Sequence, residues 1–212
     1  NAQGKTNLIE AIYMCSIGKS LRAKFERQTI KWNEDHALIS LDVEKKYGKT
    51  TIDIILSKST KKTVRINKIP IKKIGELMGE LNAVFFSPDE LKLIKESPED
   101  RRRFMDISLS QTSKSYFYLL GKYEKILANR NKLLKLEANK ETIIDTLDIW
   151  NEQLANVGSK IILSRINFLN LLTPYAVLSH KYLTEEKEEL KLEYSGIKGS
   201  TEEEIKQKFL DA

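Results

Sequence analysis

The chain has 212 residues, of which 41% are hydrophobic and 31% are charged. This balance is ordinary for a globular protein with a core, and the length suits one large domain or two lobes. No stretch approaches the ~20 consecutive apolar residues of a membrane helix, and no secretory signal is expected. The single cysteine, Cys15, excludes an internal disulfide framework and fits a reducing compartment.

Positive charge is unevenly distributed along the chain, whose formal net charge is +6 and whose pI is about 9.1. The stretch from Ser57 to Lys73 holds seven basic residues and no acidic one, and the stretch from Lys114 to Lys140 holds seven basic and two acidic. Charge alone leaves two interpretations open, a nucleic-acid footprint and a solvated surface without a partner. The candidate DNA contacts are Lys58, Lys61, Lys62, Arg65, Lys68, Lys72, Lys73, Lys122 and Arg130.

Hydrophobic periodicity predicts a helix over residues 7–17, ended by Gly18. Residues 38–71 alternate apolar and polar side chains in three runs, which predicts a three-strand meander. A short helix is expected near residues 72–79. The apolar run 81–86 is predicted to be a buried strand.

The remainder is mostly helical in pattern. Ser97-Pro98 is a helix start followed by acidic residues. Two apolar seams, over residues 116–134 and 143–161, repeat at spacings of four and three and predict a pair of antiparallel helices. Pro174 is expected to bend or stop the second helix. The alternation of Leu190, Leu192 and Tyr194 suggests a strand.

Gly4-Lys5-Thr6 in front of a helix matches the second half of a phosphate-binding loop, G-x-x-x-x-G-K-[ST]. The first glycine of that pattern falls two positions before Asn1. Gly4 lets backbone N–H groups point at phosphate oxygens, and the helix N-terminus adds partial positive charge. Lys5 is suited to the β- and γ-phosphates, and the Thr6 hydroxyl to Mg²⁺. An ordinary exposed turn before a helix is the alternative.

The acidic residues that an ATPase needs for Mg²⁺ and for the attacking water are harder to find. The best local candidate is Asp89-Glu90 after the apolar run 81–86, but Ser87-Pro88 displaces these acids from the end of the run. No LSGGQ-like segment is present. The chain alone therefore carries no visible machinery for hydrolysis.

Several stretches resemble one family in order and spacing. The segment Asn1–Tyr13 (NAQGKTNLIEAIY) resembles the nucleotide loop and first helix of the RecF family, and Gly18–Arg22 (GKSLR) resembles the segment that follows it. Pro88–Asp106, with its SPEDRRRFMD block, resembles the family's own signature. Tyr123–Asn131 resembles its first long helix. The resemblance extends over nearly the whole chain.

The resemblance implies an α/β P-loop head of the ABC type, incomplete here, with a helical second lobe that contains a long antiparallel helix pair. The expected division is an N-terminal part of the ATPase lobe over 1–100, a helical lobe over 101–188, and a return to the ATPase lobe over 189–212. It also implies that the Walker B acids and the signature motif lie beyond Ala212.

Family resemblance further implies binding of ATP and Mg²⁺, a homodimer with nucleotides between two heads, and binding of single-stranded and gapped DNA. It implies work with RecO and RecR to place RecA at gaps, in repair, replication and the SOS response, in the bacterial cytoplasm at the nucleoid. Hydrolysis would be slow and DNA-stimulated. No membrane partner is expected.

The resemblance implies that the loop residues and Arg22 bind the nucleotide. Arg22 resembles an arginine of SMC heads that approaches the nucleotide. Arg101–Arg103 could contact DNA or hold the lobes together. The nucleotide-binding candidates are Asn1, Ala2, Gln3, Gly4, Lys5, Thr6 and Arg22. Two rival functions stay open, a small-molecule P-loop kinase with a helical lid and a non-catalytic interaction module.

Overall fold

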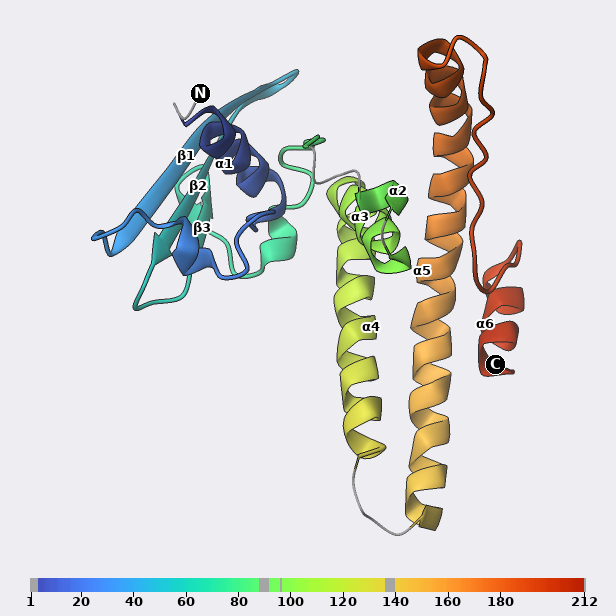
Figure 1. Cartoon of the computed structure of the whole chain (residues 1–212). Helices are drawn as coiled ribbons and strands as arrows, with labels where there is room; N and C mark the ends of the chain where they lie inside the picture. The colour runs from blue at the N-terminus through green and yellow to red at the C-terminus, as the bar shows by residue number, and fades with distance from the viewer. Residues whose placement is uncertain (1–3, 88–91, 96, 136–139, 212) are drawn as a thin grey trace. The chain divides into compact units, whose positions relative to one another are not determined.

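The computed structural model describes the chain except residues 1–3, 88–91, 96, 136–139 and 212. Its contacts divide the chain into two compact units, Asn1–Lys114 and Ser115–Ala212. The first unit holds the sheet and the first helices, and the second holds the long helices (Figure 1). The lobe boundaries expected from the sequence, at residues 100 and 188, remain a prediction, because a compact unit is not by itself a functional lobe.

The sheet of the first unit is an antiparallel meander in the order β1-β2-β3-β4. Its strands are β1 (His36–Lys45), β2 (Gly48–Ser57), β3 (Thr63–Ile66) and β4 (Ile69–Pro70). The three predicted strands are confirmed, and the two-residue β4 is added to them. Ile39 pairs with Ile54, and Ile54 pairs with Val64, so the apolar positions of all three strands fall on one face.

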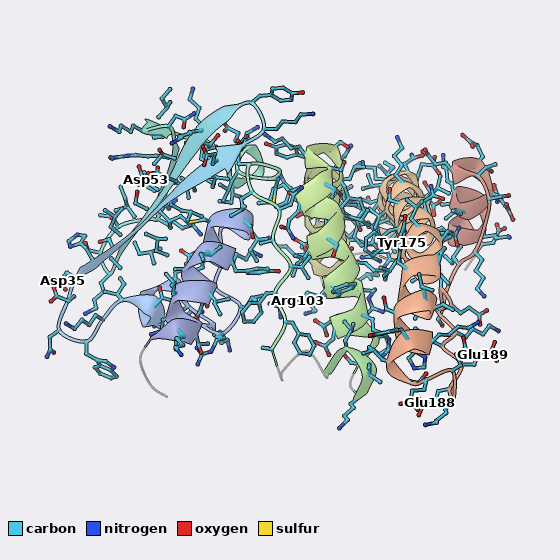
Figure 2. All side chains as sticks on the ribbon, turned by 90° about the horizontal axis from the view of Figure 1, so that it is seen from above. Asp35, Asp53, Arg103, Tyr175, Glu188 and Glu189 are labelled. Carbon is cyan, nitrogen blue, oxygen red and sulfur yellow. The ribbon has the colours of Figure 1, made fainter. Side chains whose placement is uncertain are left out.

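Helix α1 (Lys5–Ile17) contributes the other layer of this core. Its C-terminal half is buried from Tyr13 to Ile17, and β2 is buried at Ile52, Ile54 and Leu56. Figure 2 shows side chains filling the layer between α1 and the sheet. The first half of α1 is open to solvent. The predicted apolar stripe of the helix is therefore only partly buried, and Leu8, Ile9 and Ile12 remain exposed.

The end of α1 is fixed by a glycine and a lysine. Gly18 caps the helix in the left-handed region, with φ 73°, and donates its N–H to the Met14 carbonyl over 2.7 Å. The Nζ of Lys62 donates to the Gly18 carbonyl over 2.6 Å and forms an ion pair with Glu26. Lys62 thus connects the β2–β3 loop to the end of α1 and to the 3-10 turn η1 (Glu26–Thr29).

The prediction of a buried strand over residues 81–86 is wrong. The segment has no strand pairing, and the side chains of Val84 and Phe86 are 96% and 81% exposed. The alternation reflects an extended chain with one half-buried face, on which Phe85 lies 5.7 Å from the Tyr13 ring. The Ala83 backbone is paired with a side chain instead of a strand, because the Gln111 amide accepts from its N–H over 2.7 Å and donates to its carbonyl over 3.1 Å.

The short helix expected near 72–79 is reduced to the 3-10 turn η2 (Ile74–Glu76). After α2 (Lys92–Lys95), α3 runs over Pro98–Thr112. Its predicted start is confirmed, since the Ser97 hydroxyl accepts the Glu99 N–H over 3.2 Å with Pro98 in the first turn. Arg101 donates to the Leu93 carbonyl over 3.3 Å, which connects α3 to α2.

The second unit confirms the predicted antiparallel helix pair. α4 (Lys114–Leu133) and α5 (Lys140–Leu183) lie side by side and run in opposite directions in Figures 1 and 2. Tyr116 and Ile126 of α4 are buried, as are five apolar side chains in the described part of α5. The five are Leu154, Ala155, Val157, Ile161 and Ile162. Arg130 continues the seam as a polar contact, because its Nε donates to Asn151 Oδ1 over 2.7 Å.

Helix α5 does not stop at Pro174 but continues to Leu183. A proline removes one backbone hydrogen bond, which a helix of 44 residues tolerates. By length and composition, Thr146–Leu183 is apolar enough to cross a membrane, contrary to the expectation from the sequence, although core helices of soluble proteins meet the same criterion. The absence of a membrane partner remains a prediction.

The strand expected from Leu190 to Tyr194 is also wrong. These residues are extended and alternately half-buried without strand pairing, and the segment runs beside α5 (Figure 1). Burial raises the pKa of Tyr123 on α4, Arg165 opposes the rise, and Tyr194 adds to it. The chain then enters α6 (Glu202–Leu210), which packs on α5, where a Cβ at Gly158 would lie 2.9 Å from the Phe209 ring.

We predict that Gly18→Ala destabilises the fold. An added Cβ would lie 2.5 Å from Cδ1 of Ile74, and alanine is disfavoured at φ 73°. We expect the free energy of unfolding to fall by about 1–3 kcal/mol in urea titrations of the full-length protein. Gly121→Ala on α4 is the matched control, because nothing lies within 4 Å of its added Cβ. Equal stability of the two variants would contradict the packing described for Gly18.

A second prediction concerns alkaline pH. Burial raises the pKa of the Cys15 thiol from 9.0 to about 11, and the negative charge of Asp53 adds to the rise. Between pH 9 and 11 the unfolded chain gives up this proton while the folded chain keeps it. The free energy of unfolding should therefore decrease with pH, by up to about 2 kcal/mol. Urea titrations at both pH values should show this decrease, and Cys15→Ala should lack it.

Candidate nucleotide-binding site

The predicted phosphate loop stands at the open end of α1. Gly4 is the N-cap, with φ 78° and ψ 6°, a left-handed conformation that favours glycine. Within the described residues no side chain caps this end, and the first turn of the helix contains no acidic residue. The first-turn N–H groups and the positive end of the helix dipole therefore remain available to an anion.

Lys5 and Thr6 occupy the first turn, and both are exposed. Their position agrees with an ammonium for phosphate oxygens and a hydroxyl for Mg²⁺, although their role as contacts remains a prediction. The other loop candidates, Asn1, Ala2 and Gln3, lie outside the described residues. So do Asp89 and Glu90, the acidic pair considered for Walker B.

Arg22 is held close to this end of α1 by a network around Ser20. The Ser20 hydroxyl donates to Glu10 and accepts the backbone N–H groups of Arg22 and Ala23 over 3.1 and 2.8 Å. The Arg22 guanidinium lies 3.6 Å from Glu10 Oε2. Because Glu10 follows Thr6 by four residues, the two lie on the same face one helical turn apart. The structure thus places Arg22 about one turn from the predicted Mg²⁺ ligand.

Glu10 and Ser20 have no predicted role in the sequence, yet they position Arg22. Glu10 is a carboxylate with only 14% of its side chain exposed, and the Ser20 hydroxyl binds it from ten residues away. The signal that was available is local: a serine two residues before an arginine favours a turn in which its hydroxyl accepts the following N–H groups.

A cavity of about 430 Å³ adjoins Arg22 within the first unit. Its lining includes Tyr13 of α1, Phe85 of the extended segment, and Asp100 and Arg103 of α3, of which Arg103 is labelled in Figure 2. Lys5 and Thr6 do not line it. Among the described residues, Lys5 and Thr6 are therefore on open surface, and the cavity is lined by Arg22 but not by them.

The basic run from Lys58 to Lys73 does not form one patch. Lys58, Lys61 and Lys62 belong to the loop at one end of β2, whereas Lys68 lies in the β3–β4 turn beside Thr51, about 20 Å away along the strand. Arg65 of β3 pairs with Asp53 of β2, on the face of the sheet away from the buried Ile54 and Val64. Lys72 and Lys73 are exposed after β4.

At least three of the candidate DNA contacts have partners within the fold. Lys62 is only 17% exposed and binds the Gly18 carbonyl and Glu26, and Arg130 binds Asn151. Lys122 on α4 is exposed, and Lys58 lies 4.0 Å from Asp35. DNA binding by any of these residues remains a prediction. Within the described part of the chain, no group of three or more His, Cys, Asp or Glu residues could hold a metal ion.

Comparison with known proteins identifies the relatives of this chain. The DNA replication and repair protein RecF of Alkaliphilus oremlandii is 45% identical over 214 residues, which is 99% of this chain and 58% of the relative. RecF of Clostridium perfringens is 47% identical over 194 residues, which is 92% of this chain and 53% of the relative. The resemblance to the RecF family is confirmed. The chain spans a little over half the length of these relatives.

Solved structures agree with this result. A structure of the recombination mediator protein RecF-ATP in the RecFOR pathway has a TM-score of 0.87 and 34% identity, over 100% of this chain and 57% of that one. The RecF-ATPrS structure has the same TM-score, with 32% identity and 58% of its length covered. The predicted fold class, an incomplete RecF-type head with a helical lobe, is thereby confirmed. No protein-family model matches the chain.

We predict that Ser20→Ala loosens the Arg22 turn. The change removes the hydroxyl partner of a largely buried carboxylate and the acceptor of two backbone N–H groups. The free energy of unfolding should fall by about 1–3 kcal/mol, measured by thermal unfolding of the full-length protein. Ser59→Ala, in an exposed loop, should change it by less than about 0.5 kcal/mol. If the two variants were equally stable, the network would not be holding Arg22.

Proposed function

We propose that this chain is the ATP-binding part of a RecF-type DNA replication and repair protein. The observation that carries the proposal is the open, glycine-capped start of α1 with Lys5 and Thr6 in its first turn. It stands in a fold that superposes over its whole length on a structure of RecF-ATP. Backbone N–H groups and Lys5 would bind the phosphates, and Thr6 would bind a Mg²⁺ ion that accompanies them.

Arg22 is the second element of the proposed site. It lies one turn from Thr6 and is held there by Ser20 and Glu10. A guanidinium on a fixed turn can balance phosphate charge without the entropy loss of an unrestrained side chain. Glu10 keeps the guanidinium next to a carboxylate, so nucleotide binding would exchange part of one ion pair for another.

The wider function follows from the relatives. We propose that the whole protein binds single-stranded and gapped DNA, forms an ATP-dependent homodimer, and acts with RecO and RecR to place RecA at gaps. The protein would act in the bacterial cytoplasm and take part in the SOS response. The names of the relatives state replication and repair, and those of the solved structures state a recombination mediator in the RecFOR pathway. Hydrolysis would be slow and DNA-stimulated, with Walker B and signature residues supplied elsewhere.

The experiment is ATP-dependent DNA binding by the full-length protein, compared with its Lys5→Ala variant at two salt concentrations. ATP should strengthen binding of the wild type, and the variant should lose that gain, because Lys5 supplies the mobile charge to the phosphates. Binding should fall steeply with salt, as phosphate contacts predict. Lys19→Ala, an exposed lysine at the other end of α1, is the matched control and should behave as the wild type.

DNA binding that is absent, or indifferent to both ATP and Lys5, would sink the repair function as proposed. In that case phosphoryl transfer to a metabolite would favour the P-loop kinase. Failure of both assays would favour a non-catalytic interaction module. The assays therefore separate the three functions.

A further inference from the structure

Two turns of the sheet project together at the end of β2 opposite its Lys58 loop. The β1–β2 hairpin turns at Lys46 and Tyr47, since Lys45 pairs with Gly48. The β3–β4 turn consists of Asn67 and Lys68, since Ile66 pairs with Ile69. The residues of these turns were not grouped by the sequence pattern, because some 20 residues separate them.

Hydrogen bonds hold the two turns next to each other. Asn67 donates its N–H to the Thr51 carbonyl over 2.8 Å, and its Oδ1 accepts the Thr51 N–H over 2.9 Å. Thr51 is two residues from Lys49 on β2, and neighbouring strands are about 4.8 Å apart. Lys68, which follows Asn67 in the turn, therefore lies at the same end of the sheet as Lys49.

The base of the hairpin is anchored while its tip is left open. Lys45 donates to Glu80 over 2.8 Å, and Lys114 lies 3.5 Å from the same carboxylate. This hydrogen bond from Lys45, opposed by burial, lowers the pKa of Glu80. Lys46, Lys49 and Lys68 are exposed. In the described part of the chain, the ion-pair partner of these lysines is Glu44, which lies 4.0 Å from Lys49, and both members of that pair are solvent-exposed.

Tyr47 gives the tip a planar surface. Its side chain is 86% exposed, and the Lys46 ammonium lies 5.2 Å from its ring centroid. An exposed aromatic ring among lysines costs solvation without contributing to a core. The combination of an aromatic platform with flanking cations is the one that proteins use for single strands, by stacking on bases and pairing with phosphates.

Backbone strain at Lys68 is independent evidence that this residue is there for more than folding. Asn67 and Lys68 have φ of 52° and 67°, the two left-handed positions of a tight hairpin turn. Asparagine tolerates this region, but the second position favours glycine, and a lysine there is strained. Residues held in such strained conformations cluster at functional sites.

We propose that the hairpin tip, defined as Lys46, Tyr47, Lys49 and Lys68, is a contact site for single-stranded nucleic acid. Tyr47 stacks on a base, and the three lysines pair with successive phosphates. The inference rests on the proposed DNA-binding function and deepens it by naming a site. An anionic membrane is the less suitable partner, because Tyr47 is the only large apolar side chain within residues 45–49 and 67–68.

The test measures binding of a fluorescent thirty-nucleotide poly(dT) strand to the full-length protein by anisotropy, with ATP, over a salt series. Tyr47→Ala should weaken binding about tenfold with an unchanged salt slope, and Tyr47→Phe should restore it, because stacking needs the ring and not the hydroxyl. The pair Lys46→Gln and Lys49→Gln should reduce the salt slope by about 1.4, or about 0.7 for each lost phosphate contact.

Lys68→Gly separates binding from folding. Glycine relieves the strain at φ 67°, so the thermal midpoint should stay the same or rise while the affinity falls. A structural role for Lys68 would lower both. The matched control is the double variant Lys31→Gln and Trp32→Ala, which removes another exposed lysine and an exposed aromatic that lie beside Glu34 and Asp35. It should bind poly(dT) as the wild type does.

Two results would overturn the inference alone. The first is that the wild-type protein binds poly(dT) and every hairpin-tip variant binds it with the same affinity. The other is loss of binding to phosphatidylglycerol vesicles in those variants with poly(dT) affinity unchanged. If the wild type binds no DNA with or without ATP, the proposed function itself fails, and the hairpin-tip site fails with it.

Discussion

Burial of the second half of α1 against the sheet is the constraint on which the first unit depends. Met14 and Cys15 are almost inaccessible there, and Gly18 and Lys62 hold the helix end against the β2–β3 loop. With one half fixed, the direction of the helix axis is fixed, and so is its dipole. The exposed first turn can then serve as an anion site without its own tertiary contacts. Rigidity at Tyr13–Ile17 would hold the proposed phosphate contacts Lys5 and Thr6 in place.

The same packing decides which cations remain free for other partners. Lys62 belongs, by sequence, to a run of seven basic residues, but its ammonium group already binds the Gly18 carbonyl at the end of α1 and the Glu26 carboxylate. Lys45 is likewise taken by Glu80, whereas Lys46 beside it is open. The number of basic residues along the chain therefore does not give the number of cations free on the surface, because some of them are already in ion pairs within the fold. What remains is distributed over both ends of β2 rather than along one stripe.

Prediction from the sequence succeeded where a signal is local or periodic. The meander and its register follow from period-two alternation in β1–β3, and the α3 start follows from Ser97 and Pro98. The two false strands, at 81–86 and 190–194, show the limit of the same signal, because alternation predicts an extended chain with one buried face but not a hydrogen-bonding neighbour. Helix α6 had a signal in Thr201 and Glu204 that the prediction did not use.

For the candidate site, the sequence predicted the phosphate-binding loop but not the residues that position Arg22 beside it. Gly4-Lys5-Thr6 is a contiguous pattern, whereas Glu10, Ser20 and Arg22 meet only after the chain has turned at Gly18. Contacts of that kind depend on where the turn places each side chain, which no spacing rule encodes. The placement of Lys49 and Lys68 at the same end of the sheet has the same origin, since Asn67 binds the Thr51 backbone.

Both units leave large apolar side chains uncovered. Leu8 and Ile9 on α1, and Val84 and Phe86 on the extended segment, are largely open to water, while the chain spans 58% or less of the relatives compared above. On α5, Leu171, Tyr175, Leu178 and Tyr182 form a stripe at spacings of four, three and four. Apolar surface of this extent lowers stability or recruits a partner. Energies measured in the full-length protein are therefore the ones that test the contacts described for this chain.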